Sequence, residues 1–266
     1  MATISTHSVV DPKAHIGSDV EIGPFCVVGP NVTLGNGCRL ISHVTLAGHT
    51  TVGKNNTFFP NCVVGTIPQD QKYRGGPTRL EIGDGNTIRE AATLHLGTEA
   101  GGGVTRIGNG NLVMVNCHVG HDALIGDQCI LGNNVMIAGH VVCGNRVALM
   151  GGVGIHHFVS IGDFAYIGGA ARIRHDVPPF VKVAGDDRIR GLNTIGLRRA
   201  GFDDQTIEAL DKACRCLFLR DKPLAIAMAE FVTQNGLDPS VKKMIDFLRR
   251  RDQGIHGRYL ESQRAK

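Results

Sequence analysis

The sequence has no tryptophan, and aromatic residues make up only 5% of its 266 positions. Large aromatic side chains therefore do not dominate its core. It also has no apolar run near the ~20 residues that a membrane-spanning helix needs. Its first residues lack the basic segment followed by an apolar segment that marks a secretory signal. These absences predict a cytoplasmic protein without a membrane span.

The eight cysteines show no C-x-x-C spacing, which is the pattern of many zinc and redox sites. Reduced and buried thiols are the simpler interpretation, and the sequence predicts no metal and no cofactor. The formal charge of +4 is too small for the basic footprint of a nucleic-acid-binding protein. It is compatible with an acidic protein partner or a phosphorylated ligand.

Glycine is abundant, with 36 residues, and it accompanies a six-residue repeat. Apolar residues recur at every sixth position from residue 4 to 64 and, after a shift of one residue, from 107 to 173. Glycine often follows them, as in Ile16-Gly17. A period of six fits neither an α-helix nor an ordinary two-faced strand. It predicts a parallel β-helix of very short strands, with the apolar residue inward and glycine at the corner.

Two stretches interrupt the repeat, at residues 66–80 and 97–105. The first is polar and rich in glycine and proline, and the second separates the two frames of the repeat. Both are predicted to be loops extruded from the coil. Because loops on a rigid repeat often carry function, ligand contacts are expected there.

Helical spacing of apolar residues replaces the six-residue period near the end of the chain. Asp221 and Asp238 are predicted helix N-caps, and Gly236 is a predicted helix stop. The sequence therefore predicts a mainly β chain with two domains. A β-helix covers residues 1–185, and a small C-terminal α-helical domain covers residues 186–266.

Histidines are concentrated in one part of the repeat. His121 lies beside Asp122, and His140 and His156 follow it at intervals that are each close to the length of one coil. Because one coil consists of three hexads, these side chains should stack near one edge of the coil. Three uses of such a column are open: a general base near neutral pH, a zinc site between subunits, or contacts to phosphate and sugar hydroxyls.

Motifs outside the hexads occur in a specific order along the chain. They are Pro68-Gln69-Asp70-Gln71-Lys72-Tyr73, Thr98-Glu99-Ala100-Gly101-Gly102-Gly103, His118-Val119-Gly120-His121-Asp122, Ala138-Gly139-His140-Val141, Asp176-Val177-Pro178-Pro179 and Gly191-Leu192-Asn193. With these motifs the chain resembles, over essentially its whole length, the UDP-N-acetylglucosamine O-acyltransferase family, which carries out the first step of lipid A biosynthesis. The resemblance implies a left-handed β-helix, a homotrimer and no cofactor.

The resemblance also implies catalytic roles. His121 matches the general base that takes the proton from the sugar 3-hydroxyl, and Asp122 would orient its imidazole. The hydroxyl then attacks the thioester of a 3-hydroxyacyl chain on acyl carrier protein. The backbone N–H of Gly139 matches the donor to the developing oxyanion.

Further positions match substrate contacts of the family. The resemblance implies that these residues bind the sugar nucleotide: Gln69, Asp70, Lys72, His118, His140, His156, Asn193 and Arg199. Of these, Asn193 would supply a contact from a neighbouring subunit, and Arg199 would supply a contact to a phosphate. Gly169 matches the position that limits acyl length, so the groove should accept a longer chain than a Met there would allow. The docking site of the carrier protein stays open among basic residues: Arg172, Lys242, Lys243, Arg249, Arg250 and Arg251.

The sequence departs from the family at two positions, because His157 replaces a common Gln and Ala200 replaces the second Arg of a frequent pair. It also leaves open whether the sugar carries a 3-hydroxyl or a 3-amino group. Three other functions are weighed. A zinc hydratase resembling γ-class carbonic anhydrase would use three histidines between subunits. The later N-acyltransferase of the same pathway carries an extra N-terminal domain, for which hexads starting at Ile4 leave no room. A non-catalytic hexapeptide scaffold needs no histidine column.

Overall fold

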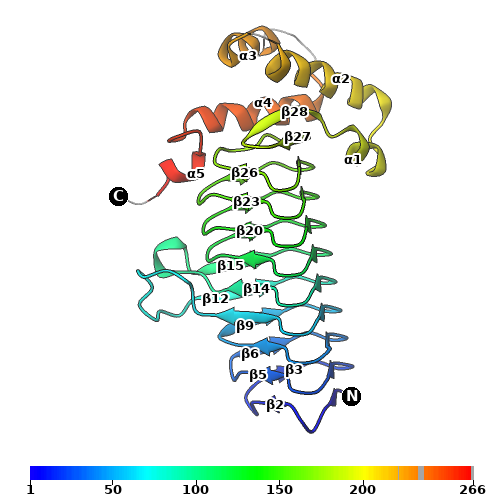
Figure 1. Ribbon diagram of the computed structural model, residues 1–266, viewed down its shortest axis with the longest axis vertical. Coiled ribbons are helices and arrows are strands. Elements are labelled where there is room, and N and C mark those ends of the chain that lie inside the picture. Colours follow the sequence, from blue (N-terminus) through cyan, green and yellow to red (C-terminus); the bar gives the residue numbers. More distant parts are fainter. Residues whose placement is uncertain (221, 233–236, 265–266) are drawn as a thin grey trace.

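The computed structural model describes residues 1–220, 222–232 and 237–264. As predicted, the chain is mainly β and forms a left-handed parallel β-helix. Figure 1 shows a narrow column of stacked coils with the N-terminus at one end and helices at the other. Each coil contributes one short strand to each of three faces, and equivalent strands pair in parallel from coil to coil.

The first face is an eleven-stranded sheet. In order of pairing it contains β1 (Thr3–Ile4), β4 (Glu21–Ile22), β7 (Arg39–Leu40), β10 (Thr57–Phe58), β13 (Thr87–Ile88), β16 (Leu112–Val113), β19 (Ile130–Leu131), β22 (Ala148–Leu149), β25 (Tyr166–Ile167), β27 (Val181–Ala184) and β28 (Arg188–Leu192). The last pair, β27 and β28, is antiparallel and closes the column.

The other two faces have nine and eight strands. The second face contains β2 (Val9–Val10), β5 (Val27–Val28), β8 (Thr45–Leu46), β11 (Val63–Thr66), β14 (Thr93–His95), β17 (His118–Val119), β20 (Met136–Ile137), β23 (Gly154–Ile155) and β26 (Arg172–Ile173). The third face contains β3 (His15–Ile16), β6 (Val32–Leu34), β9 (His49–Val52), β12 (Arg79–Ile82), β15 (Val104–Ile107), β18 (Leu124–Ile125), β21 (Val142–Cys143) and β24 (Ser160–Ile161).

The predicted apolar residues of the hexads form the core of the column, and those from Ile22 onward are buried. Ile4 is 44% exposed because its coil is the first and nothing covers its outer side. A second inward column lies two positions earlier in each hexad, with Val20 and Cys26 as its first members. Most core cysteines belong to this column. Burial raises the pKa of Cys62 to about 12, so this thiol is structural rather than reactive.

The two predicted loops leave the column where the strand register requires extra chain. Paired residues lie one coil apart. Val52 pairs with Ile82, and Ile82 pairs with Ile107, so each of these two coils contains more residues than an ordinary coil, such as the one from Ile16 to Leu34. The extra residues form the segments after β11 and after β14, and the second contains a short 3₁₀ helix, η1 (Glu99–Gly101). Glu99 accepts a hydrogen bond from the N–H of Gly76 at 2.6 Å, so the two loops support each other.

Helices cover the end of the column, as Figure 1 shows. They are α1 (Thr194–Arg199), α2 (Asp204–Cys214), the π-helix η2 (Arg215–Leu219), α3 (Leu224–Val232), α4 (Pro239–Asp252) and α5 (Tyr259–Ser262). The buried carboxylate of Asp176 accepts from the N–H groups of Ser160 and Tyr259, at 2.7 and 2.8 Å, and so ties α5 to the coil.

The predicted N-cap at Asp238 is confirmed, because its side chain accepts from the N–H of Ser240 at 2.7 Å. Asp221 and Gly236 lie outside the described residues. The domain boundary predicted after residue 185 falls within the β27–β28 hairpin, and the division into two domains stays a prediction. None of the helices described here has the length and apolar character of a membrane span.

Candidate active site

The predicted base lies at a corner of the column between β17 and β18. Asp122 and His140 occupy the same corner position in successive coils and have left-handed φ values of 59° and 62°. Asp and His are among the non-glycine residues that adopt this conformation most often. His121 therefore stands in register with Gly139, and the N–H of His140 donates to the His121 carbonyl at 3.0 Å. The structure places the histidines near one edge, with His140 above Asp122 rather than above His121.

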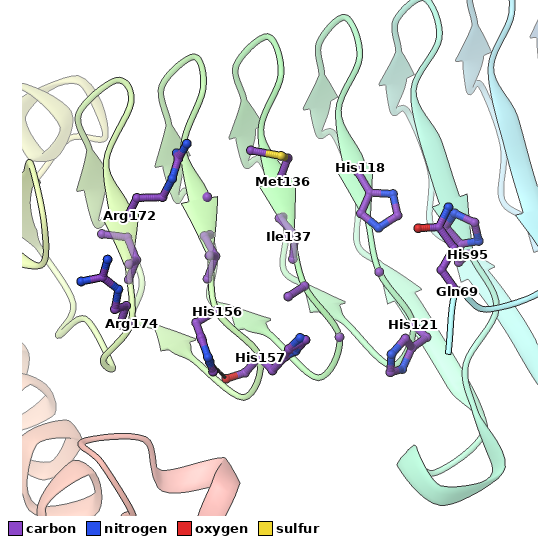
Figure 2. Close-up of a pocket in the computed structure, with 16 residues that line it drawn as sticks. Gln69, His95, His118, His121, Met136, Ile137, His156, His157, Arg172 and Arg174 are labelled. Atoms are coloured by element: carbon purple, nitrogen blue, oxygen red, sulfur yellow. Dashed lines mark hydrogen bonds between the residues drawn. The ribbon is translucent and has the colours of Figure 1, made fainter. Parts of the chain in front are cut away.

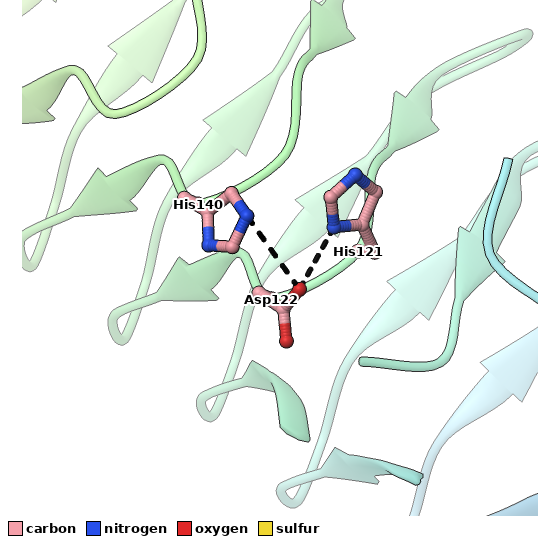
Figure 3. Close-up of side chains that lie close together, drawn as sticks. All are labelled: His121, Asp122 and His140. Atoms are coloured by element: carbon pink, nitrogen blue, oxygen red, sulfur yellow. Dashed lines mark hydrogen bonds and ion pairs between the residues drawn. The ribbon is translucent and has the colours of Figure 1, made fainter. Parts of the chain in front are cut away.

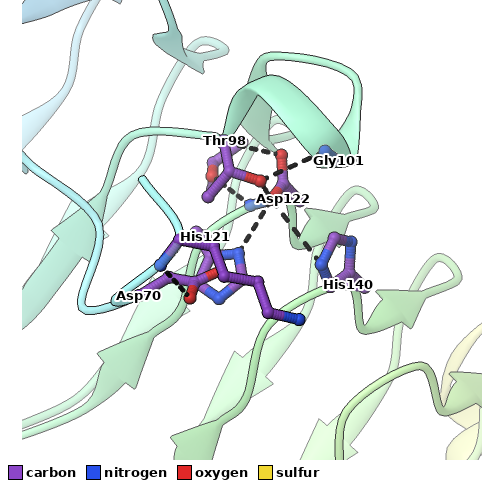
Figure 4. A network of polar contacts seen from close by, with 8 residues as sticks. Asp70, Thr98, Gly101, His121, Asp122 and His140 are labelled. Atoms are coloured by element: carbon purple, nitrogen blue, oxygen red, sulfur yellow. Dashed lines mark hydrogen bonds and ion pairs between the residues drawn. The ribbon is translucent and has the colours of Figure 1, made fainter. Parts of the chain in front are cut away.

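Asp122 holds the imidazole of His121 in one orientation (Figures 3 and 4). Its Oδ2 lies 2.8 Å from His121 Nδ1 and accepts the hydroxyl of Thr98 at 2.6 Å, while its Oδ1 accepts the Thr98 N–H at 2.9 Å. Because a carboxylate only accepts hydrogen bonds, His121 Nδ1 carries the hydrogen. The neutral ring then has its lone pair on Nε2, as a general base requires.

The electrostatics favour a charged Asp122 close to a neutral His140. Burial alone would raise the pKa of Asp122, but hydrogen bonds from His121 and Thr98 outweigh it and bring the pKa below its usual value. Burial lowers the pKa of His140, although the Asp122 charge opposes this shift. Burial also lowers the pKa of His118, with the nearby imidazoles of His95 and His121 adding to the effect. Near neutral pH, His118 and His140 are therefore uncharged.

Gly139 is fitted closely to the ring of His121. A Cβ at this position would lie 2.5 Å from His121 Cε1 and 2.6 Å from Nε2, so only glycine leaves room for the imidazole. Within the described part of the chain, the N–H of Gly139 donates to no acceptor. A free backbone donor therefore lies next to the candidate base, where an oxyanion would need it.

Two cavities meet at His121. The first, which we call the apolar groove, has a volume of about 530 Å³ and runs along the second face (Figure 2). It is lined by Gln69, His95, His118, Gly120, His121, Met136, Ile137, Ala138, Gly139, Gly154, Ile155, His156, His157, Arg172, Ile173 and Arg174. Most of its middle section is aliphatic, and the polar side chains lie towards its ends and along one side (Figure 2).

The second, which we call the polar cavity, has a volume of about 870 Å³. It lies on the side of the Asp122 corner and reaches the C-terminal segment. It is lined by Gln69, Asp70, Lys72, Thr98, Ala100, Gly101, His121, Asp122, Leu124, His140, Val142, His156, His157, Phe158, Leu260, Glu261, Gln263 and Arg264. Twelve of these 18 residues carry charged or hydrogen-bonding side chains, so the cavity suits a polar ligand.

Most predicted site residues line one or both cavities: Gln69, Asp70, Lys72, His118, His121, Asp122, Gly139, His140 and His156. Asn193, Arg199 and Gly169 line neither cavity of the single subunit, as far as the described residues define them. Asn193 instead caps α1 and donates from Nδ2 to the carbonyl of Phe164 at 2.8 Å.

The structure adds residues that the sequence argument missed. Thr98 anchors Asp122 with two hydrogen bonds. His95 lines the apolar groove, and its buried Nε2 has no partner among the described residues. Arg172 was considered only as a docking candidate, yet it lines the groove. Sequence spacing gives little signal for Thr98, because it lies in the segment after β14, outside the hexads.

The zinc alternative can be tested against the donor geometry. Ligand atoms of His121, Asp122 and His140 lie within 4.8 Å of one another, which is close enough for a shared cation (Figure 3). However, both oxygens of Asp122 already accept hydrogen bonds from Thr98, and Oδ2 also faces the His121 Nδ1 hydrogen. A cation would have to displace these bonds, so the arrangement favours an oriented base.

Replacing Asp122 by Asn tests its anchoring role. An amide nitrogen cannot accept from both Thr98 donors, so we expect a loss of about 1.5–3 kcal/mol of stability at pH 7, the range for hydrogen bonds to charged groups. Since the native pKa of Asp122 is lowered, its stabilisation is present above the ordinary pKa and is lost as pH falls through the lowered value. The difference between wild type and variant should therefore shrink in acid, as urea unfolding at pH 7 and near pH 3 would measure.

Asp19→Asn is the control, because Asp19 has the same left-handed corner conformation but a side chain that is 79% exposed. Its variant should match the wild type at both pH values. An Asp122→Asn effect that is small, or that is equal at the two pH values, would contradict the anchoring role.

Comparisons with family models match both parts of the chain. The model described as "Udp N-acetylglucosamine O-acyltransferase; Domain 2" matches residues 176–256. The model for bacterial transferase hexapeptide repeats matches residues 2–36, 13–48 and 105–139. The six-residue period and the C-terminal segment thus each have a counterpart among known families.

Similar proteins cover nearly the whole chain. A protein from Halorhodospira halophila is 44% identical, and one from Myxococcus xanthus is 47% identical, each over 96% of this chain and 99% of the relative. Both are named acyl-[acyl-carrier-protein]–UDP-N-acetylglucosamine O-acyltransferase. The solved structure of a UDP-N-acetylglucosamine acyltransferase from Bacteroides fragilis has a TM-score of 0.89 and 37% identity, covering 93% of this chain and 97% of that one.

Proposed function

The chain belongs to the UDP-N-acetylglucosamine O-acyltransferase family, and from this we infer its reaction. It transfers a 3-hydroxyacyl chain from acyl carrier protein to the 3-hydroxyl of UDP-N-acetylglucosamine, the first step of lipid A biosynthesis. One observation supports this function most directly. An apolar groove and a polar cavity meet at the His121 imidazole, which Asp122 orients, as a reaction between an acyl chain and a sugar nucleotide requires.

We propose that His121 acts as the general base. Its Nε2 takes the proton of the sugar 3-hydroxyl while the oxygen attacks the thioester carbon. The N–H of Gly139 donates to the oxyanion of the tetrahedral intermediate. When the intermediate collapses, the C–S bond breaks, and the thiolate of the carrier takes the proton from the His121 imidazolium. Asp122 stabilises that imidazolium and fixes the tautomer in which Nε2 is free.

We propose that each cavity binds one of the two substrates. The acyl chain occupies the apolar groove, where burial of each methylene contributes about 0.8 kcal/mol. The sugar nucleotide occupies the polar cavity, where Asp70, Lys72 and His140 offer hydrogen bonds and charge. Gln69, His156 and His157 line both cavities and so lie between the two substrates.

We also propose that the active unit is a homotrimer. Asn193 and Arg199 line neither cavity of one subunit, so their predicted roles at the nucleotide require contributions from a neighbouring chain. Action in the cytoplasm follows from the proposed substrates, which are a carrier-bound acyl chain and a sugar nucleotide. Amide formation on a 3-amino sugar stays a second candidate, because His121 could accept a proton from either acceptor.

A transfer assay tests the proposal. Purified protein is given 3-hydroxyacyl carrier proteins of several lengths with UDP-N-acetylglucosamine or its 3-amino analogue, and products are identified by mass spectrometry. We expect an ester on the 3-hydroxyl and no dependence on added zinc. Faster amide formation would select the second candidate. CO₂ hydration that requires zinc, or no transfer at all from folded protein, would reject the acyltransferase function in favour of the hydratase or the scaffold.

A further inference from the structure

Two loops that leave the column contribute to the polar cavity. The first loop, residues 67–78, follows β11, and the second loop, residues 96–103, follows β14. The first loop supplies three of the proposed sugar-nucleotide contacts to the cavity lining: Gln69, Asp70 and Lys72. The second loop supplies Thr98, which is bonded to Asp122, as Figure 4 shows. The position of the first loop therefore decides where these three contacts lie.

Few hydrogen bonds join the first loop to the rest of the molecule. Within the residues that the structure describes, they occur at two places. At the start of the loop, the Ile67 carbonyl lies 2.8 Å from Nδ1 of His95. Near its end, Oε1 of Glu99 accepts from the backbone N–H of Gly76 at 2.6 Å and from that of Arg74 at 3.3 Å. The described stretch between these places, which carries the substrate contacts, makes hydrogen bonds only within itself.

Glu99 and Gly76 are matched in charge and in space. Hydrogen bonds from its own backbone N–H and from that of Gly76 lower the pKa of Glu99, so its carboxylate is charged at neutral pH. A charged acceptor makes shorter and stronger hydrogen bonds than a neutral one. Gly76 allows the close approach, because a Cβ there would lie 2.5 Å from Cγ and 2.6 Å from Oε1 of Glu99.

We propose that Glu99 is a positioning residue for the sugar nucleotide, which holds the first loop at Gly76 so that Asp70 and Lys72 line the polar cavity. The inference rests on the proposed acyl transfer and adds a residue that itself lines neither cavity. Glu99 directly follows Thr98, so the same short segment holds both the first loop and Asp122. Without Glu99 the loop samples other arrangements, and the apparent affinity for the sugar nucleotide falls with the fraction of loops that is correctly placed.

The first test is the Glu99→Ala variant in the transfer assay. Its KM for UDP-N-acetylglucosamine should rise about tenfold, as expected if the loop is correctly placed in about one molecule in ten. The value of kcat should change little, because Asp122 keeps its bonds to His121 and Thr98. Glu99→Gln keeps an oxygen that can accept from both backbone N–H groups, so its KM should stay close to that of the wild type.

Glu21→Ala is the matched control, because Glu21 is also an exposed carboxylate with a hydrogen-bond partner, Arg39, but lines neither cavity. Its KM should equal that of the wild type. An unchanged KM in Glu99→Ala would overturn the proposal. So would a loss that appears in kcat alone, or a Glu99→Gln variant as impaired as Glu99→Ala.

Gly76→Ala tests the same contact from the other side. Its Cβ would displace the flexible carboxylate of Glu99, so KM should again rise about tenfold. In the double variant Glu99→Ala/Gly76→Ala the displaced atoms are already absent, so KM should be no higher than in either single variant. Multiplied effects would mean that the two residues act independently, which would contradict the proposal.

Trypsin cleavage gives a readout that does not depend on activity, since the first loop contains Lys72 and Arg74. Cleavage at these sites follows the population of displaced loops. It should be faster in Glu99→Ala and Gly76→Ala than in the wild type, at similar melting temperatures, and an unchanged rate would overturn the proposal. If the wild type transfers no acyl chain, the proposed function fails, while the cleavage rates still test whether Glu99 holds the loop.

Discussion

The His121→Ala variant is expected to lose transferase activity by about 10²–10⁴-fold, the usual contribution of a positioned general base. The structure supplies the reason, because the buried Asp122 carboxylate holds Nδ1 and leaves Nε2 beside the free N–H of Gly139. The loss should appear in kcat more than in KM, since proton transfer in the transition state is removed while both cavities remain. Initial rates with saturating sugar nucleotide would measure it.

Folding is the necessary control for this variant. The side chain of His121 is 14% exposed and lies outside the core, so the melting temperature and the oligomeric state should be close to those of the wild type. His43→Ala serves as the matched substitution, because His43 also lies at a coil corner but packs on the exposed Phe25, remote from both cavities. It should keep full activity. Substantial transfer by folded His121→Ala protein would assign the base to another group.

The six-residue period predicted the fold because each coil repeats one physical requirement. An inward side chain must be apolar every sixth residue, and this requirement is visible without coordinates. The second inward column was missed, since it mixes Val20, Cys26 and Asn56 and has no single chemical character. The buried Asn56 is tolerated because its side-chain oxygen accepts hydrogen bonds from the backbone N–H and from Nδ2 of Asn86. Asn86 is the residue at the equivalent position in the next coil.

The sequence predicted which residues form the candidate site, but not which of them occupy equivalent positions in successive coils. Intervals close to one coil indicated a histidine column, yet the step from His121 to His140 is one position longer than a coil. His140 therefore falls above Asp122 and not above His121. The partners of Asp122 depend on side-chain directions and on a loop. Thr98, which lies outside the hexads, leaves no periodic trace in the sequence.

Gly139→Ala is expected to reduce kcat by about 10²-fold, although alanine keeps the backbone N–H that would donate to the oxyanion. The new Cβ would lie 2.5 Å from Cε1 and 2.6 Å from Nε2 of His121, so the imidazole must move by about 1 Å or rotate away from Asp122. A displacement of this size at a reacting group typically costs that much in rate. Steady-state kinetics with both substrates saturating would measure the loss.

The matched control is Gly151→Ala, which has a similar backbone setting. Gly151 also precedes a left-handed corner residue, Gly152, but a Cβ there would meet only the Asn133 carbonyl, at an ordinary 3.4 Å. Both variants replace by alanine a glycine whose φ is ordinary. Such a substitution by itself tends to stabilise a fold by about 0.4–1 kcal/mol, because it lowers the conformational entropy of the unfolded chain. Because the donor N–H survives in both, a loss confined to Gly139→Ala would isolate the placement of His121. Full activity in Gly139→Ala would mean that catalysis does not depend on the imidazole lying over this glycine, and the placement assigned to His121 would be wrong.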